Sequence, residues 1–300
     1  MDLVICNTPF QVLQIQNMID KGIINEFELF YFSSKKTDQM NFYFDLLKKR
    51  ACKSTFYISN KKFPYHILDM RRVFKGRRYR NIYSASVDSV YTHSILSFSH
   101  FLNFFSFDDG SANLIENSAY YVDQRSCLKK NLFKLLGCCY DLEKTKMAIN
   151  CHYTIYKNRE NIVSNRVEVE FEFFSRNNIV TITNKKPVAN VLLGPVFHEL
   201  SLSNSDKKSL IKKLSALVKG ENCYYIPHPR ETEFHFEYAK CIEGLEIAES
   251  KILSLLNEYD YINVYGFNSS VQINLSSHHD IRNILLDTSS MLNESASHPK

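Results

Sequence analysis

The sequence predicts an α/β protein with two Rossmann-like domains. Short apolar segments alternate with longer amphipathic ones, which is typical of βα units and a parallel sheet. The chain has 300 residues, of which 44% are hydrophobic, and this length suits two domains. The polar stretch TNKKP, residues 183–187, interrupts the alternation, and a new apolar strand follows it. We therefore expect domains at residues 1–185 and 186–300.

The apolar segments set the expected elements in order. In PFQVLQIQNMIDKG, apolar residues recur near helical spacing and stop at Gly22, which predicts a helix. The strands expected in the first half are Asp2–Cys6, Phe27–Phe32, Ser54–Ile58, Ser89–Thr92 and Phe104–Phe107. In the second half they are Val188–Leu193, Cys223–Ile226, Tyr261–Val264 and Asn283–Asp287. The helices expected there are Asp206–Lys219, Thr232–Cys241 and Ile247–Leu256.

Unusual residues follow five of the expected strands, in the segments NTPFQ, DDGSAN, GPVFHE, PHPRE and YGFNSS. In open α/β sheets, ligands bind beyond the carboxyl ends of the strands. We therefore expect the chemistry of this protein at these five loops.

Composition and charge limit the class of partner. The formal net charge is +5, but Arg71–Arg80 holds six basic residues in ten positions. Such a run is either a solvated surface or a docking patch for anionic lipid or glycolipid headgroups. No nucleic-acid-binding motif accompanies it, so no nucleic acid is expected.

The eight cysteines have no CxxC pair and no zinc-ligand spacing. Cys6 and Cys223 fall in expected strands, which indicates small buried hydrophobes in a reducing compartment. The first strand starts without a basic region before it, which argues against a signal peptide. The apolar runs are also far shorter than the roughly 20 residues that cross a bilayer. We expect a cytoplasmic protein that touches a membrane at most peripherally.

Two loops offer groups for proton transfer. His228 stands between two prolines, which stiffen the turn, and an imidazole can pass a proton to a leaving oxygen. Asp108 and Asp109 precede Gly110, which suggests a tight turn from which only one carboxylate enters the crevice. The alternatives are an incidental surface histidine and an acid that merely caps a turn.

The remaining loops suggest phosphate binding without a metal. Asn268–Ser270 open a helical segment, where hydroxyl groups suit either a phosphate or an ordinary N-cap. GPVF lacks the Walker lysine and NTPFQ lacks the Rossmann glycines, so NTPase and NAD sites are excluded. HEL lacks the second histidine of zinc proteases, and no spaced pair of acids indicates a metal site.

The order of these motifs resembles that of the bacterial lipooligosaccharide sialyltransferases of glycosyltransferase family 52. The motifs are NTPFQ at 7–11, DDG at 108–110, IPHPRE at 226–231 and YGFNSS at 265–270. The resemblance implies a GT-B-type fold, in which two Rossmann-like domains face each other across a crevice. It also implies CMP-sialic acid as donor, a terminal galactose as acceptor, no metal and a homodimer.

The resemblance also implies roles for single residues. Asp109 would be the general base, supported by Asp108 and Gly110, and His228 would be the general acid or a phosphate partner. Ser269 and Ser270 would hold the CMP phosphate. Further donor-binding residues would be Thr8, Gln11, Gly194, Pro229, Arg230 and Glu231.

Two other functions remain open on the sequence. One is a hexosyltransferase of the same family that uses a UDP-sugar. The other is a non-catalytic protein that binds an anionic glycan or membrane through Arg71–Arg80. The expected location is bacterial and cytoplasmic, with peripheral contact at the inner membrane.

Overall fold

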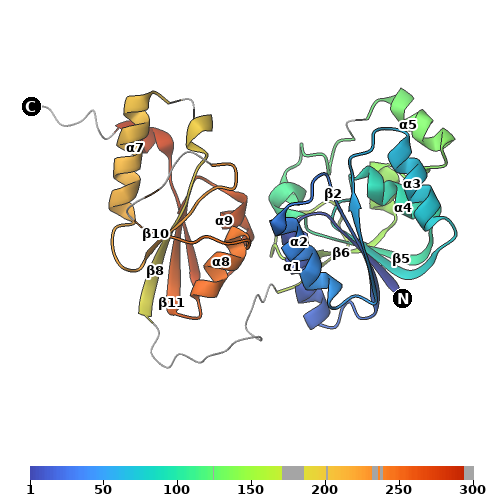
Figure 1. Ribbon diagram of the computed structural model, residues 1–300, viewed down its shortest axis with the longest axis horizontal. Helices are drawn as coiled ribbons and strands as arrows, with labels where there is room; N and C mark the ends of the chain where they lie inside the picture. The colour runs from blue at the N-terminus through green and yellow to red at the C-terminus, as the bar shows by residue number, and fades with distance from the viewer. Residues whose placement is uncertain (124, 171–185, 201, 232–235, 237–238, 294–300) are drawn as a thin grey trace, which may run out of the picture. The chain divides into compact units, whose positions relative to one another are not determined.

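The computed structural model describes residues 1–300 apart from 124, 171–185, 201, 232–235, 237–238 and 294–300. The chain divides into an N-terminal unit, residues 1–172, and a C-terminal unit, residues 173–300. The expected boundary at residue 185 falls on the part that is not described, and the first strand of the C-terminal unit begins at Lys186. Each unit is a parallel sheet covered by helices (Figure 1), which confirms the α/β class.

The N-terminal unit contains seven strands in the order β3-β2-β1-β4-β5-β6-β7, all paired in parallel. Its strands are β1 Asp2–Cys6, β2 Phe27–Ser33, β3 Lys53–Ile58, β4 Arg78–Ser84, β5 His100–Phe107, β6 Ile149–Thr154 and β7 Arg166–Glu168. Its helices are α1 Pro9–Asp20, α2 Asp38–Lys48, α3 Tyr65–Phe74, α4 Val90–Phe98, the 3-10 turn η1 Gly110–Leu114, α5 Cys127–Leu135 and α6 Leu142–Met147.

The two faces of this sheet are covered by different helices. Helices α1 and α2 lie on one face, and α3 and α4 lie on the other (Figure 1). Every residue of β1 and β2 is buried, as expected for central strands covered on both sides. On the α3 and α4 face, Met70, Phe74 and Ile95 pack against Ile5 and Phe30.

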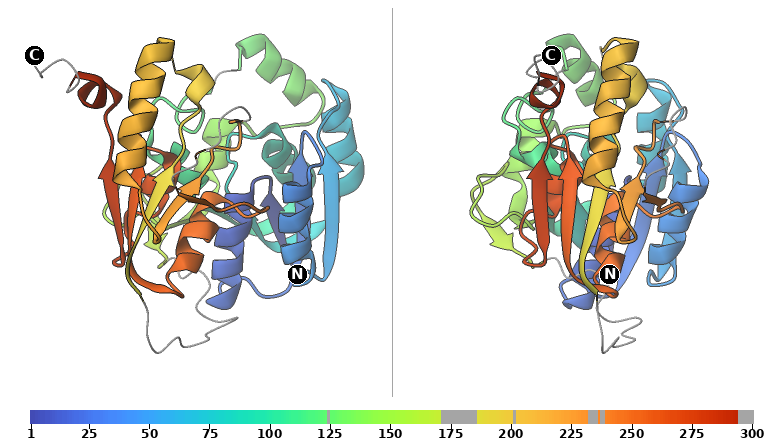
Figure 2. Two further views of the ribbon diagram at one scale, coloured as in Figure 1. Left: turned by 60° about the vertical axis from the view of Figure 1, so that its left-hand side comes forward. Right: turned by 90° about the vertical axis from the view of Figure 1, so that its left-hand side faces the viewer.

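The C-terminal unit repeats this plan with five parallel strands in the order β10-β9-β8-β11-β12. Its elements are β8 Lys186–Leu193, the 3-10 turn η2 Phe197–Glu199, α7 Asn204–Leu217, β9 Cys223–Ile226, β10 Lys240–Cys241, α8 Ala248–Leu255, β11 Tyr259–Gly266, α9 Ser270–Asn274, β12 Ile281–Leu285 and α10 Thr288–Asn293. Helix α7 covers one face of the sheet and α8 and α9 cover the other, as Figure 2 shows from two further sides.

Two expected elements were wrong, and the strand β4 was not expected. Ser89–Thr92 is not a strand: the Ser89 hydroxyl caps α4, which buries Thr92, Ile95 and Leu96 at helical spacing. The strand β4 was missed because its exposed arginines hide its apolar alternation. The expected helix Thr232–Cys241 is wrong at its end, because Lys240–Cys241 forms a strand that pairs with β9. Residues 232–235 and 237–238 lie outside the described part of the chain.

The basic run Arg71–Arg80 is divided between the end of α3, a turn and β4. Arg77 pairs with Glu28 at 2.7 Å, and Arg80 pairs with Asp2 at 3.1 Å. Both acids are buried, so these two arginines neutralise carboxylates at the amino ends of β1 and β2. Arg77 and Arg80 therefore stabilise the fold by pairing with buried acids.

All eight cysteines are free, and Cys6 and Cys223 are buried as predicted. Among the described residues, no helix is both long and apolar enough to cross a bilayer.

Candidate active site

The five loops singled out in the sequence all follow the carboxyl ends of parallel strands. They follow β1 and β5 in the N-terminal unit and β8, β9 and β11 in the C-terminal unit. Each sheet has the Rossmann order, so the strand order reverses between β1 and β4 and between β8 and β11. Ligands of such sheets bind at this switch point. The candidate residues therefore lie at the expected edge of each sheet.

Asp108 is completely buried at the end of β5. Its carboxylate accepts hydrogen bonds from the Ile155 backbone N–H at 2.7 Å, from His152 Nε2 at 2.9 Å and from Asn161 Nδ2 at 2.9 Å. On the far side of the His152 ring, Ser106 Oγ lies 2.7 Å from Nδ1. This Ser–His–Asp chain is inaccessible to a substrate, so it ties β5 to β6 rather than forming a nucleophilic triad.

Asp109, the next residue, is partly exposed. Its backbone N–H donates to Asn113 Oδ1 at 2.9 Å, and its Oδ2 accepts a hydrogen bond from the Tyr120 hydroxyl. The chain then turns sharply at Gly110, whose φ of 60° lies in the left-handed region that suits glycine. Asp108 is therefore enclosed by protein, while Asp109 keeps partial access to solvent.

Burial raises the pKa of Asp109, and the nearby charge of Asp108 raises it further. Hydrogen bonds from Tyr120, Gln11 and Ser86 oppose this shift by stabilising the carboxylate. Asp88 faces the same hydroxyl of Tyr120, and its pKa is raised by burial and by the charge of Asp109. A carboxylate with a raised pKa is a stronger base than an ordinary aspartate, which suits proton abstraction from a hydroxyl.

The NTPFQ loop lies beside this carboxylate. Thr8 is the N-cap of α1, and its hydroxyl accepts from the Gln11 backbone N–H at 3.3 Å. The Gln11 side chain is buried: its Oε1 accepts from the Asn7 N–H at 2.8 Å, and its Nε2 donates to Ser86 Oγ at 3.0 Å. The strand-end loops of β1, β4 and β5 are thus joined by polar side chains.

Sequence reasoning missed the loop after β4, residues 85–89, and Tyr120. The loop supplies Ser86 and Asp88, and buried His93 fixes it, because His93 Nε2 lies 2.8 Å from the Val87 carbonyl. Burial and the charge of Arg125 lower the pKa of His93 to about 4, so this histidine is neutral. With β4 unrecognised, the loop could not be placed at a strand end.

In the C-terminal unit, His228 is half-buried in the loop after β9. Its Nδ1 accepts a hydrogen bond from the Arg230 backbone N–H at 3.1 Å, so the neutral ring carries its proton on Nε2. Burial lowers the pKa of His228, and the charge of Arg230 lowers it further. The imidazole is therefore neutral near pH 7 and offers Nε2–H as a donor.

Neighbouring loop residues brace this turn. Glu231 accepts from the Phe197 N–H at 2.7 Å, and the exposed Arg230 pairs with Glu199 at 2.6 Å. These bonds tie the loop after β9 to the loop after β8. Pro229 is exposed beside them.

Gly194 follows β8 at a point where a side chain would require Tyr225 to move. A Cβ at this position would lie 2.3 Å from the Tyr225 hydroxyl oxygen. The Gly194 N–H donates to the Ile226 carbonyl at 2.9 Å, which continues the pairing of β8 with β9. The absence of a side chain brings the backbone of this loop against the Tyr225 ring.

Ser269 is the N-cap of α9, with its hydroxyl accepting from the Gln272 N–H and the Gln272 side chain accepting from the Ser269 N–H. Gln272 also donates to the Val264 and Ile284 carbonyls, both at 3.2 Å. Ser270 is exposed at the first position of the helix. The Ser269 hydroxyl retains its own proton for donation, and the Ser270 hydroxyl is accessible.

One group of described side chains is close enough together to bind a metal, formed by His278, His279 and Asp280. It precedes β12, at the amino end of the sheet. The candidate residues lie at the opposite, carboxyl ends of the strands, so this group is separate from them. Asp109 and His228 belong to different units. That the two side chains act on the same substrate stays a prediction.

Comparison with known proteins identifies the family. The sequence profile of glycosyltransferase family 52 matches residues 18–290. A CMP-N-acetylneuraminate:beta-galactoside alpha-2,3-sialyltransferase of Pasteurella multocida (strain Pm70) is 31% identical, covering 93% of this chain and 89% of that protein. An N-acetyllactosaminide alpha-2,3-sialyltransferase of Haemophilus influenzae is 26% identical, covering 96% and 93%.

Solved structures support the fold. The glycosyltransferase SnogD from Streptomyces nogalater has a TM-score of 0.50 at 8% identity, covering 98% of this chain and 85% of its own. A UDP-N-acetylglucosamine 2-epimerase also has a TM-score of 0.50, at 9% identity, covering 98% and 86%. The two Rossmann-like units form a GT-B-type fold, as predicted. Because the family profile spans most of the sequence, this chain belongs to glycosyltransferase family 52.

Proposed function

We propose that this chain is an inverting sialyltransferase that moves sialic acid from CMP-sialic acid to a terminal galactose of a lipooligosaccharide-type glycan. The observation that carries the proposal is Asp109, a partly exposed carboxylate of raised pKa at the carboxyl end of β5, beside the loops after β1 and β4 that form the switch point. The names of the Pasteurella and Haemophilus relatives support this donor and acceptor, and they suggest an α-2,3 linkage.

Asp109 is the general base in this proposal. It takes the proton of a galactose hydroxyl while the oxygen of that hydroxyl bonds to the anomeric carbon of sialic acid. The bond between that carbon and the phosphate oxygen breaks, and CMP leaves with the electron pair. A single displacement of this kind inverts the anomeric centre, as in other glycosyl transfers with paired groups on opposite sides.

His228 acts on the leaving group. Its neutral ring offers Nε2–H, so it hydrogen-bonds a phosphate oxygen of CMP and stabilises the negative charge that develops there. We favour this phosphate-partner role over a general acid, because a pKa below the ordinary histidine value leaves little imidazolium at neutral pH. Ser269 and Ser270 donate their hydroxyls to the same phosphate.

The other donor-binding residues are proposed to shape the nucleotide site. Gly194, Pro229, Arg230 and Glu231 belong to the braced loops after β8 and β9, where backbone groups would contact CMP. Thr8 and Gln11 lie in the N-terminal unit, at the start of α1. Closure of the two units around the donor would bring these sets together and exclude water, which would otherwise hydrolyse the donor.

No metal is proposed for catalysis. CMP carries a single phosphate, and one N–H and two hydroxyl donors can stabilise its charge. The protein is proposed to work in the cytoplasm as a homodimer, in peripheral contact with the inner membrane through Arg71–Arg80. Arg71 and Arg72 are exposed at the end of α3 and suit anionic headgroups.

Incubation with CMP-sialic acid and a panel of lactose-type acceptors tests the proposal. Release of CMP should depend on the acceptor, and NMR of the product should show an α-2,3 linkage. Transfer from a UDP-sugar instead would assign the hexosyltransferase function. A glycan- or membrane-binding protein would release no CMP with any acceptor, and adding EDTA should leave the transfer rate unchanged.

A further inference from the structure

Helix α5 presents an apolar stripe to solvent. Leu128, Leu132 and Leu135 are 72%, 41% and 84% exposed. Their spacing of four and three residues places them on one side of a helix. Single apolar residues scattered over a protein surface are normal, but three exposed leucines in one stripe form a contiguous apolar patch, which is typical of an interaction site.

Lysines flank this stripe on both sides. Lys129 and Lys134 are exposed, α5 contains no acidic residue, and neither lysine forms an ion pair among the described residues. A third lysine, Lys130, is different: it pairs with Asp123 at 3.0 Å. The exposed surface of α5 is therefore apolar in the middle and positive at its edges.

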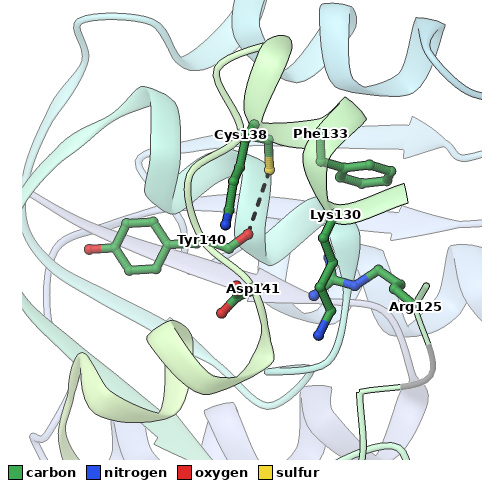
Figure 3. A pocket seen from close by; sticks show the side chains of 7 residues that line it. Arg125, Lys130, Phe133, Cys138, Tyr140 and Asp141 are labelled. Carbon is green, nitrogen blue, oxygen red and sulfur yellow. Dashed lines mark hydrogen bonds between the residues drawn. The ribbon is translucent and has the colours of Figure 1, made fainter. Parts of the chain in front are cut away.

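The opposite side of α5 holds the helix firmly on the N-terminal unit. Phe133 is buried in a cluster with Ile67 and Cys138, and it stacks on Phe63 with ring centroids 5.4 Å apart. Figure 3 shows Phe133 and Lys130 on α5, with Arg125 next to Lys130. Arg125 also lies over the Phe133 ring, 5.7 Å from its centroid. The stripe is thus carried by an anchored helix.

We propose that the outer face of α5, formed by Leu128, Lys129, Leu132, Lys134 and Leu135, is a docking surface for a membrane that contains anionic lipids. The leucines enter the boundary between headgroups and acyl chains, and the lysines contact the phosphates, as in other interfacial amphipathic helices. Charge decides against a second copy of the chain, because a two-fold interface would bring the lysines of both copies together. This surface is distinct from Arg71–Arg80, which lacks an exposed leucine stripe.

The absence of tryptophan from the sequence allows a direct test. The variant Leu135→Trp places one reporter on α5, and Leu102→Trp places one on β5, at a leucine that is 78% exposed. Phosphatidylcholine vesicles with phosphatidylglycerol should shift the emission of the α5 reporter to shorter wavelength and leave the β5 reporter unchanged. An unshifted α5 reporter, or an equal shift in both, would overturn the proposal.

Sedimentation with the same vesicles measures the affinity. Replacing all three stripe leucines by serine should weaken partitioning about tenfold or more, since burial of leucine side chains supplies the apolar part of binding. Replacing Lys129 and Lys134 by serine should weaken the preference for phosphatidylglycerol over pure phosphatidylcholine, and Arg71 and Arg72 would supply the preference that remains. The matched control is a double variant, Leu102→Ser with Leu285→Ser, which replaces exposed leucines outside α5. It should bind the vesicles with the affinity of the wild type.

Two results would point elsewhere and overturn the proposal. If the leucine variant bound vesicles normally but dissociated a dimer in analytical ultracentrifugation, a second copy would cover the stripe. If Arg71→Ser with Arg72→Ser abolished binding and the leucine variant did not, the basic run would be the docking surface. Lipid binding does not rest on the sialyltransferase proposal, because transfer to soluble lactose should be the same in wild type and leucine variant.

Discussion

The turns that carry Asp109 and His228 are built in different ways. The Asp109 turn depends on contacts from distant parts of the chain: Tyr120, Ser86 and Gln11 all bear on its carboxylate. The orientation of the His228 ring is set locally, since two prolines enclose the histidine and its ring bonds the backbone two residues later. Burial shifts both pKa values toward the neutral form, upward for the acid and downward for the imidazole.

A base and a hydrogen-bond donor need different surroundings. A carboxylate of raised pKa needs a partly desolvated place, and hydrogen bonds must still stabilise the charged form that reacts. A neutral histidine needs only a fixed tautomer, which one backbone N–H provides. We therefore expect substitutions to act in different ways in the two turns.

The largest effect is expected at Asp109. Asp109→Asn keeps the shape but removes the base, so kcat should fall about 10²–10⁴-fold. Stability should not fall with it: the raised pKa means that the folded state favours the protonated acid, so the carboxylate lowers stability as pH rises from the unfolded-state pKa through the folded-state pKa. The variant should melt at the wild-type temperature or higher at pH 7. Wild-type kcat in Asp109→Asn across the pH range would show that another group is the base.

The next effect separates the two roles of His228. His228→Ala should lower kcat about 100-fold, because a donor to the developing charge is lost. His228→Asn keeps an N–H donor and should recover part of that loss. Equal rates for the two variants would favour the general-acid role, which asparagine cannot perform.

Asp108 offers the contrast within the first turn. In Asp108→Asn, an amide meets the donor groups of Ile155, His152 and Asn161, so at least one of them loses its acceptor. The free energy of unfolding should fall by about 1–3 kcal/mol. Urea denaturation measures this loss, and unchanged stability would contradict the supporting role of this buried acid.

Substitutions of the serines before α9 should act on donor binding. Ser269→Ala with Ser270→Ala should raise the KM for CMP-sialic acid about tenfold, since hydrogen bonds to a charged phosphate are lost. Ser269→Ala alone should also lower stability by about 1 kcal/mol as the cap is removed, and Ser270→Ala should not. Unchanged calorimetric affinity for CMP in the double variant would refute the phosphate assignment.

The smallest effect tests the distant contacts of Asp109. Tyr120→Phe removes a hydrogen bond that lowers the pKa of Asp109, so that pKa should rise further. The acidic limb of the kcat/KM profile should then move to higher pH, because more base is protonated at a given pH. Tyr121→Phe is the matched control, since the Tyr121 hydroxyl donates to the Asn113 carbonyl instead. Identical acidic limbs in wild type and Tyr120→Phe would exclude this coupling.

Local periodicity made the fold class and most strands predictable. The alternation of apolar segments places strands such as Asp2–Cys6 and Cys223–Ile226 correctly, because burial on a sheet dictates residue type at each position. The same reasoning failed at Ser89–Thr92, where valine and threonine suggest a strand but a serine cap and buried apolar residues farther along make a helix.

Neighbouring residues in the sequence are enough to predict that acids, a histidine and serines follow the ends of parallel strands. Which of the two acids is accessible depends on contacts that only the folded chain makes. His152, Ile155 and Asn161 lie 44 to 53 residues from Asp108 in the chain, and they enclose its carboxylate while Asp109 stays partly exposed. Desolvation and hydrogen bonding across such distances set the pKa of Asp109, and no local pattern encodes them.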